Sequence, residues 1–316
     1  MLFAQQYRAG RISPSDCPVR SRTVEDVVRH VAQAITRLGA VDPRLNTFGE
    51  LDFRLATVLR SWKKRDPPPT RVKPLPMIVL RKAHALSAAT PLPLRISPAG
   101  DCLLIAFFFL LRPGEYSGAP RTATDDLFRV HNVGLWIGHR RLNPLCSPDP
   151  DLLAATFVTL TFTTQKNGVR GETIGHSRSG HPCFLCPVGA VVRRLLHLRG
   201  AGAAPATPLN AYRMRPDDPW CHVLPADDIT SLLRRTVTLL PPSLTDISAR
   251  STRAGGAMAM LCGGIDSDRI RLIGRWRSDK MYRYLHVQPQ PIMSGVAALM
   301  LRGGDYIREP ISVVCK

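Results

Sequence analysis

Lysine is scarce in this chain, and so are acidic residues. Of the 43 basic residues only seven are lysine, and 24 Asp and Glu residues oppose them, so the formal net charge is +19 over 316 residues. The planar fork of arginine suits two-point contact with phosphate, so an excess of arginine indicates a polyanionic partner, with nucleic acid as the first candidate. A coding sequence rich in G and C would also favour arginine, so the charge alone does not decide the function.

Long apolar runs and a paired set of cysteines are also lacking. The longest apolar run, Leu103–Leu111, has nine residues, whereas a membrane span needs about 20. We therefore expect a buried helix there, and no membrane partner. The eight cysteines are scattered and the first residues contain no continuous signal-peptide core. These features predict free thiols and an intracellular protein.

The pattern of apolar residues predicts an α+β protein that is mainly α. Thr23–Ala40 reads as an amphipathic helix, with Thr23 as N-cap and a buried stripe of Val27, Val31, Ile35 and Leu38. The pattern over residues 52–65 predicts a second, basic helix. The prolines between Asp66 and Pro76 interrupt regular structure. They divide the chain into a helical domain, residues 1–70, and a larger domain, residues 71–316.

The larger domain combines helices with a small sheet. Helical patterns cover 77–89, 98–118, 186–202 and most of the chain after residue 226. The bias toward Val, Thr and Phe predicts strands within 127–142 and 156–176, and "KNG" at 166–168 marks a tight turn.

Three separated segments contain residues suited to phosphate chemistry. Arg112 follows an apolar helix in "LLRPGEYSG", where it must meet an anion or form a structural pair with Glu115. Lys166, at the tip of the predicted hairpin, can release a proton near neutral pH if its surroundings lower its pKa. Arg250 and Arg253 lie three apart on a predicted helix and share one face.

The order of these motifs resembles that of the tyrosine recombinase (phage-integrase-like) family, in the form found in eukaryotic mobile elements. "LLRPGE" resembles the first arginine motif, "QKNGVRGE" the hairpin lysine, and "SARSTRAGGAMAML" the box that holds the second arginine. "LIGRWRSDKMYRYLH" resembles the segment that leads to the nucleophile, nine positions after Arg275, so Tyr284 is favoured over Tyr282. Residues 1–70 resemble the family's helical, SAM-like core-binding domain, which binds DNA, and 71–316 its catalytic domain.

The resemblance implies a chemistry and its partners. The tyrosine hydroxyl would attack a backbone phosphorus of double-stranded DNA and form a 3′-phosphotyrosyl link, while the arginines hold the non-bridging oxygens and the lysine protonates the leaving 5′-oxygen. No metal or other cofactor is implied. Family members assemble as tetramers on paired sites, and a eukaryotic host would place the protein in the nucleus. The implied catalytic residues are Tyr284, Arg112, Lys166, Arg253, Arg250, Arg275 and Trp276.

Two positions depart from the family pattern. Arg250 stands where the family has a histidine, and an arginine is a poor proton acceptor because its pKa lies above about 12. Arg275 occupies the place of a histidine or tryptophan, with Trp276 one residue later. Two alternatives to an active recombinase are therefore a relative that binds DNA without cleaving it and a structural protein that binds RNA or another polyanion.

A zinc site is a further candidate. His176, His181, Cys183 and Cys186 lie close together in "HSRSGHPCFLC". The cluster lacks the second, sequence-distant ligand pair that structural zinc sites use, and a loop that joins a strand to a helix explains it equally well.

Overall fold

The computed structural model describes residues 1–67, 72–89, 98–118, 127–163, 170–180, 185–213, 222–240, 246–278, 281–282, 284–285 and 296. The chain divides into two compact units, residues 1–70 and 71–316. The division falls in the proline-rich segment. That the first unit is a core-binding domain and the second a catalytic one stays a prediction.

The first unit is a small bundle of three helices: α1 (Leu2–Arg8), α2 (Ser21–Arg37) and α3 (Phe53–Arg65). Its buried core contains Ala4, Val24 and Leu55. The end of α3 is connected to the start of α2 by Asp66. Its carboxylate accepts hydrogen bonds from the backbone N–H of Ser21, at 2.8 Å, and from the Ser21 hydroxyl, at 2.6 Å.

Two details expected of α2 are wrong. The helix begins at Ser21 rather than after a Thr23 cap, because the carboxylate that satisfies its first N–H group comes from Asp66, 45 residues away. The buried side runs through Val24 and Ala32, whereas Val31 and Leu38 are exposed. Two neighbouring stripes of α2 are apolar, and packing against α1 and α3 decides which one is buried.

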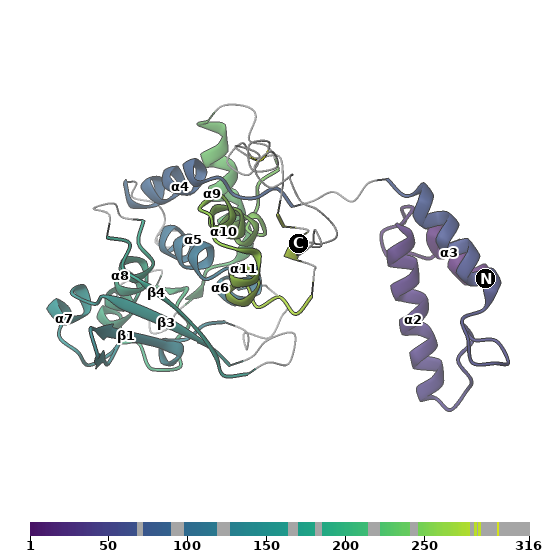
Figure 1. Ribbon diagram of the computed structural model, residues 1–316, viewed down its shortest axis with the longest axis horizontal. Helices are drawn as coiled ribbons and strands as arrows, with labels where there is room; N and C mark the ends of the chain where they lie inside the picture. Colours follow the sequence, from purple (N-terminus) through teal and green to yellow (C-terminus); the bar gives the residue numbers. More distant parts are fainter. Residues whose placement is uncertain are drawn as a thin grey trace, which may run out of the picture. The chain divides into compact units, whose positions relative to one another are not determined.

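The second unit is mainly helical with a small antiparallel sheet, so the predicted fold class is confirmed. Helix α5 (Ala99–Phe108) contains the first six residues of the longest apolar run, and most of its residues are inaccessible to water. The buried helix expected over Leu103–Leu111 therefore ends earlier, at Phe108. Its most extensive contacts are with α4 (Met77–Ala89), α8 (Pro187–Gly200) and α10 (Ser251–Cys262), and Figure 1 shows it below α4 and between α8 and α10. The remaining helices of the described part of this unit are α6 (Pro113–Tyr116), the 3-10 turn η2 (Val130–Asn132), α7 (Asp149–Leu153), α9 (Ala226–Thr238) and α11 (Ser267–Ile273).

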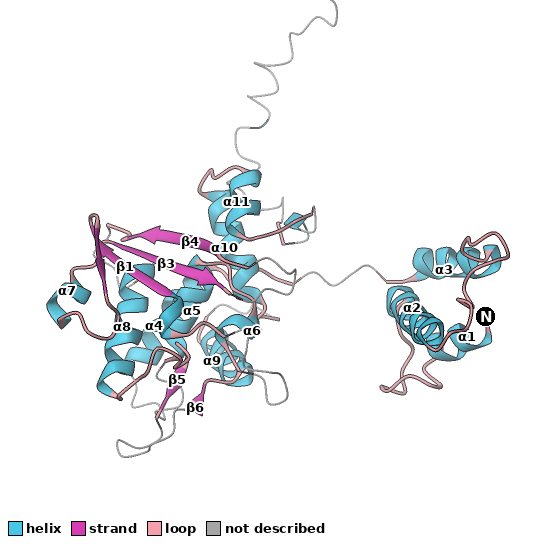
Figure 2. Cartoon of the chain, turned by 90° about the horizontal axis from the view of Figure 1, so that it is seen from below, coloured by secondary structure: helices cyan, strands magenta, loops and turns pink. Residues whose placement is uncertain are grey.

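The main sheet has the strand order β2-β1-β3-β4, with every neighbouring pair antiparallel. Its strands are β1 (Val133–Ile137), β2 (Arg140–Leu142), β3 (Phe157–Phe162) and β4 (Glu172–Ser177). They coincide with the two predicted segments, apart from the last residue of β4. Figure 2 shows α8, α4 and α5 on one side of the sheet. The turn that contains Lys166 lies outside the described residues. A second pair, β5 (Ala211–Tyr212) and β6 (His222–Val223), forms a short ladder.

None of the helices in the described part of the chain combines the length and apolar character that a bilayer span requires.

Helix α10 approaches α5 closely through glycine. A Cβ atom on Gly256 would lie 2.2 Å from the carbonyl oxygen of Phe107, and one on Gly255 would lie 2.4 Å from that of Leu75. Both neighbours are backbone atoms, which cannot swing aside as a side chain can. The "AGGA" sequence therefore fixes how near α10 comes to the end of α5.

We predict that Gly256→Ala destabilises the protein by about 1–3 kcal/mol, because the added methyl group overpacks the contact. Urea unfolding followed by circular dichroism measures this. Gly200→Ala is the matched control, since a Cβ there meets no atom within 4 Å, and its effect should be neutral or stabilising by at most about 1 kcal/mol. Equal effects of the two changes would contradict the close-approach argument.

Candidate functional site

The site is built around the place where α5 ends. The chain leaves the helix through Leu110, which adopts a left-handed conformation (φ 49°), and reaches Arg112 at the N-cap of α6. The last carbonyl groups of a helix have no partner within it. Here they are met by side chains from distant parts of the sequence, and these side chains include two of the arginines that the sequence singled out.

Arg253, on the first turn of α10, is one of them. Its Nη1 donates to the Leu110 carbonyl at 2.8 Å, and its Nη2 donates to the carbonyl of Gly274. The residue is only 3% exposed. Burial, and next the positive charge of Arg112 and Arg275, lowers the pKa of Arg253 to about 9. The positively charged form is thus held at a cost, which an anion beside it would reduce.

Arg112 is the most accessible arginine of the group, with 28% of its side chain exposed. Its backbone N–H donates to Glu115 Oε2 at 2.7 Å, and its Nη1 donates to Oε1 of the same carboxylate at 2.9 Å. Arg112 therefore forms the structural pair with Glu115 and also lies near Arg253, on whose pKa its charge acts. Arg112 can therefore both pair with Glu115 and belong to a site for an anion.

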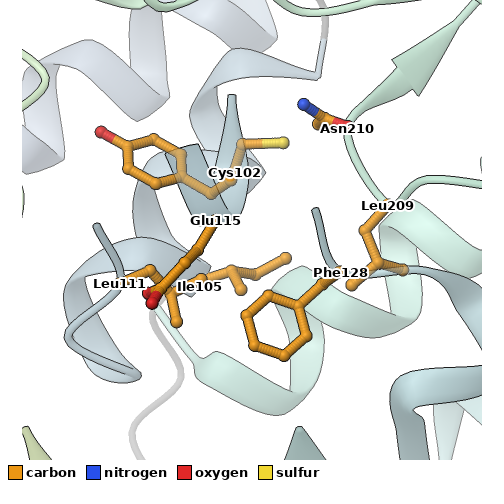
Figure 3. Close-up of a pocket in the computed structure, with 8 residues that line it drawn as sticks. Cys102, Ile105, Leu111, Glu115, Phe128, Leu209 and Asn210 are labelled. Carbon is orange, nitrogen blue, oxygen red and sulfur yellow. The ribbon is translucent and has the colours of Figure 1, made fainter. Parts of the chain in front are cut away.

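Glu115 was not among the predicted site residues except as a partner of Arg112. The residue is 5% exposed, and its Oε2 also accepts a bond from Nη2 of Arg275 at 3.2 Å. Figure 3 shows its carboxylate beside Leu111 and turned away from Cys102 and Asn210, at the edge of a small pocket. The signal available in the sequence was its position three residues after Arg112 in a short helix.

Arg275 lies in the turn after α11, in a left-handed conformation (φ 57°). Its side chain is 1% exposed, and its guanidinium carbon lies 3.6 Å from the centre of the Phe162 ring on β3. Burial is the main cause that lowers the pKa of Arg275, to about 10, and Glu115 opposes the shift. We refer to Arg112, Arg253, Arg275 and Glu115 as the arginine cluster.

Two aromatic rings cover the cluster. The guanidinium carbon of Arg253 lies 4.4 Å from the centre of the Trp276 ring, which folds back over Gly274, where a Cβ would collide with it. The ring of Tyr284 lies 5.5 Å from that of Trp276, centre to centre. Tyr284 also acts electrostatically on Arg253. The late tyrosine and the second arginine thus lie at one site.

Tyr284 is held in place by its neighbours in sequence. Met281 and Leu285 are 1% and 7% exposed and belong to a small apolar cluster with Leu110 and Ile270. The backbone N–H of Tyr284 donates to the Met281 carbonyl at 2.8 Å. Tyr282, by contrast, is 54% exposed. The chain that carries the arginine cluster thus also anchors the tyrosine beside it.

The structure therefore brings together five of the seven candidate residues: Arg112, Arg253, Arg275, Trp276 and Tyr284. Arg250, at the N-cap of α10, is exposed. Lys166 lies outside the described residues.

The zinc candidates gain no support. No group of three or more His, Cys, Asp or Glu side chains suited to a metal occurs among the described residues. Two of the candidates, His181 and Cys183, lie outside the described residues. The ring of His176 is engaged elsewhere: its Nε2 lies 2.8 Å from the Phe108 carbonyl, in the geometry of a hydrogen bond.

Comparisons with known proteins give a structural likeness. No protein-family model matches the chain, and no curated protein matches it in sequence. A structure of the Tn1549 transposon integrase in complex with transposon right end DNA is similar over 90% of this chain and 80% of that one, with 15% sequence identity and a TM-score of 0.50. A second structure of that integrase, with circular intermediate DNA, covers 94% and 84%, with 14% identity and a TM-score of 0.49. The first of these shows that the chain has the integrase fold.

We predict that Glu115→Gln destabilises the protein by about 3 kcal/mol, because it leaves the buried Arg275 without its counter-charge. Urea unfolding at neutral pH measures the loss. The control is Asp268→Asn, which removes an exposed partner 3.7 Å from Arg271 and should cost less than about 1 kcal/mol. A loss at Glu115 as small as the control's would show that its carboxylate is not the anchor of the cluster.

Proposed function

We propose that this chain is a tyrosine recombinase that cleaves and rejoins double-stranded DNA through a covalent 3′-phosphotyrosyl intermediate at Tyr284. The observation that carries the proposal is the meeting of Arg112, Arg253 and Tyr284 at one site, although 172 positions separate the first from the last. The integrase fold and the net charge of +19 agree with it.

The cluster is suited to bind a phosphate. It contains three guanidinium groups and a single carboxylate, that of Glu115, hydrogen-bonded among them. An arginine has five N–H donors. Two of those of Arg253 serve the carbonyls of Leu110 and Gly274, which leaves three for the non-bridging oxygens. Because Arg253 is buried beneath Trp276, a phosphate reaches it only if the aromatic cover shifts.

The reaction itself is a transesterification. The hydroxyl oxygen of Tyr284 forms a bond to phosphorus as the bond to the 5′-oxygen breaks, so one phosphodiester replaces another and no external energy source is needed. Arg112 and Arg253 stabilise the charge that grows on the phosphoryl oxygens. The tyrosine loses its proton and the 5′-oxygen gains one. We assign that donation to Lys166, on the resemblance described above.

The partners follow from the same proposal. Double-stranded DNA is the substrate, bound through both units, with the basic α3 in the first of them. The active form is a tetramer on paired sites, and in a eukaryotic cell it acts in the nucleus as the integrase of a mobile element. No metal or other cofactor takes part in the proposed reaction.

One observation favours a second candidate function. Arg250, in the place of a proton-accepting histidine, is exposed at the start of α10, and arginine is suited to bind a phosphate but is a poor proton acceptor. A protein that holds DNA without cleaving it would have the same cluster. Trapping of the covalent intermediate separates the two functions.

We predict that the wild-type chain forms an SDS-resistant adduct with a library of nicked duplexes of random sequence, in which the cut fragment diffuses away and traps the intermediate. Tyr284→Phe should abolish the adduct, because it removes the attacking oxygen and keeps the ring. Tyr282→Phe, the matched control, should leave it unchanged. DNA binding without any adduct from the wild type would favour the second function.

We further predict that each chain uses its own tyrosine, since Met281 and Leu285 anchor Tyr284 within the chain that holds Arg253. Mixing Arg253→Gln with Tyr284→Phe should then give no adduct. When the Arg253→Gln variant is instead mixed with size-tagged wild-type protein, only the wild-type chain should become linked to DNA. An adduct restored by mixing the two variants would show that the tyrosine is exchanged between chains.

A further inference from the structure

Arg275 differs from the other two arginines of the cluster in how its donors are used. Nη1 donates to the carbonyls of Phe109, at 3.1 Å, and Ile273, at 3.4 Å. Nη2 donates to the carbonyl of Leu110 and to Glu115 Oε2, both at 3.2 Å. These four acceptors match the four Nη hydrogens of a guanidinium. No Nη donor of Arg275 is left for a substrate.

The remaining donor is enclosed. Nε of Arg275 is buried and has no hydrogen-bond partner among the described residues. One face of the guanidinium lies against the Phe162 ring. With a side chain that is 1% exposed, Arg275 cannot touch a phosphate without giving up bonds to the backbone.

Each of the other two arginines shares an acceptor with Arg275. The Leu110 carbonyl accepts from Arg253 as well as from Arg275. The Oε2 atom of Glu115 accepts from the backbone N–H of Arg112 as well as from Arg275. Arg275 therefore joins the carbonyl that orients Arg253 to the carboxylate that orients Arg112.

The backbone supports this arrangement. Left-handed conformations of residues other than glycine cost about 1–3 kcal/mol and persist where the surroundings fix them. Both Leu110 and Arg275 adopt one, and the hydrogen bond between them connects the two strained turns. The turn at Arg275 sends its side chain inward, whereas Trp276 contacts Arg253 and Tyr284.

We propose that Arg275 is a positioning residue, which sets the spacing of Arg112 and Arg253 through Glu115 and the Leu110 carbonyl and does not contact DNA. The proposal rests on the function proposed above. Under this proposal Arg275 does not touch the reacting phosphate. Of the two chain neighbours Arg275 and Trp276, only Trp276 faces the tyrosine.

The first test is a double-mutant cycle on the single-turnover rate of adduct formation. Lysine at 275 keeps the charge but loses the fork, so Arg275→Lys should slow the reaction by about 30-fold, the scale of a small misplacement of catalytic groups. In a Glu115→Gln background the same change should cost less than about threefold, because the link it acts through is already broken. An undiminished 30-fold loss in that background would overturn the proposal. Circular dichroism at the assay temperature checks that each variant is folded.

The second test needs no cleavage. For a 30-base-pair duplex of random sequence, the slope of log affinity against log salt concentration becomes shallower by about 0.9 for each phosphate that the protein no longer neutralises. Arg275→Gln should leave the slope unchanged, whereas Arg253→Gln, the comparison variant, should make it shallower by that amount. A slope altered equally by both variants would place Arg275 on the DNA and overturn the proposal.

The two tests distinguish a failure of this proposal from a failure of the proposed function. A wild-type chain that binds duplex DNA but never forms an adduct removes the proposed catalytic function, and the salt slope still decides where Arg275 lies. A chain that does not bind duplex DNA overturns both proposals.

Discussion

The arginine cluster is assembled on the carbonyl groups at the end of helix α5. The last carbonyls of a helix carry partial negative charge and lack partners within the helix. In this protein His176, Arg275 and Arg253 meet the successive carbonyls of Phe108, Phe109 and Leu110. They come from β4, the turn after α11, and α10. The bonds that complete the helix are therefore the same ones that assemble the cluster.

Gathering three guanidinium groups there carries an electrostatic cost. Burial lowers the pKa of both Arg253 and Arg275, and the bonds to carbonyls and to Glu115 offset only part of that penalty. Arg112 is the arginine of the cluster that reaches solvent. In the function proposed above, a bound phosphate would supply the missing counter-charge. The electrostatic cost of gathering the guanidinium groups would then be offset in the complex with DNA.

Much of the fold could be predicted from local pattern. Strands within 127–142 and 156–176 and the helix at 77–89 lie where β-branched residues and apolar periodicity indicated them. The stripe of α2 that is buried could not be predicted. Residues such as Val31 belong to an apolar row as regular as that of Val24, and only contact with α1 and α3 selects between them. The cap of α2 was likewise missed because its acceptor, Asp66, is remote in sequence.

The candidate residues could be identified from the sequence, because the order of motifs along the chain singles out Arg112, Arg253 and Tyr284. Tertiary structure alone decided what surrounds each of them. Arg275 and Trp276 are neighbours in the chain, yet a left-handed turn sends one toward Phe162 and the other toward Tyr284. Glu115 and Leu110, whose oxygens accept hydrogen bonds from Arg275, lie 160 and 165 positions earlier in the chain. No local pattern encodes such a pairing, since it arises only when α5 and the last turns pack together.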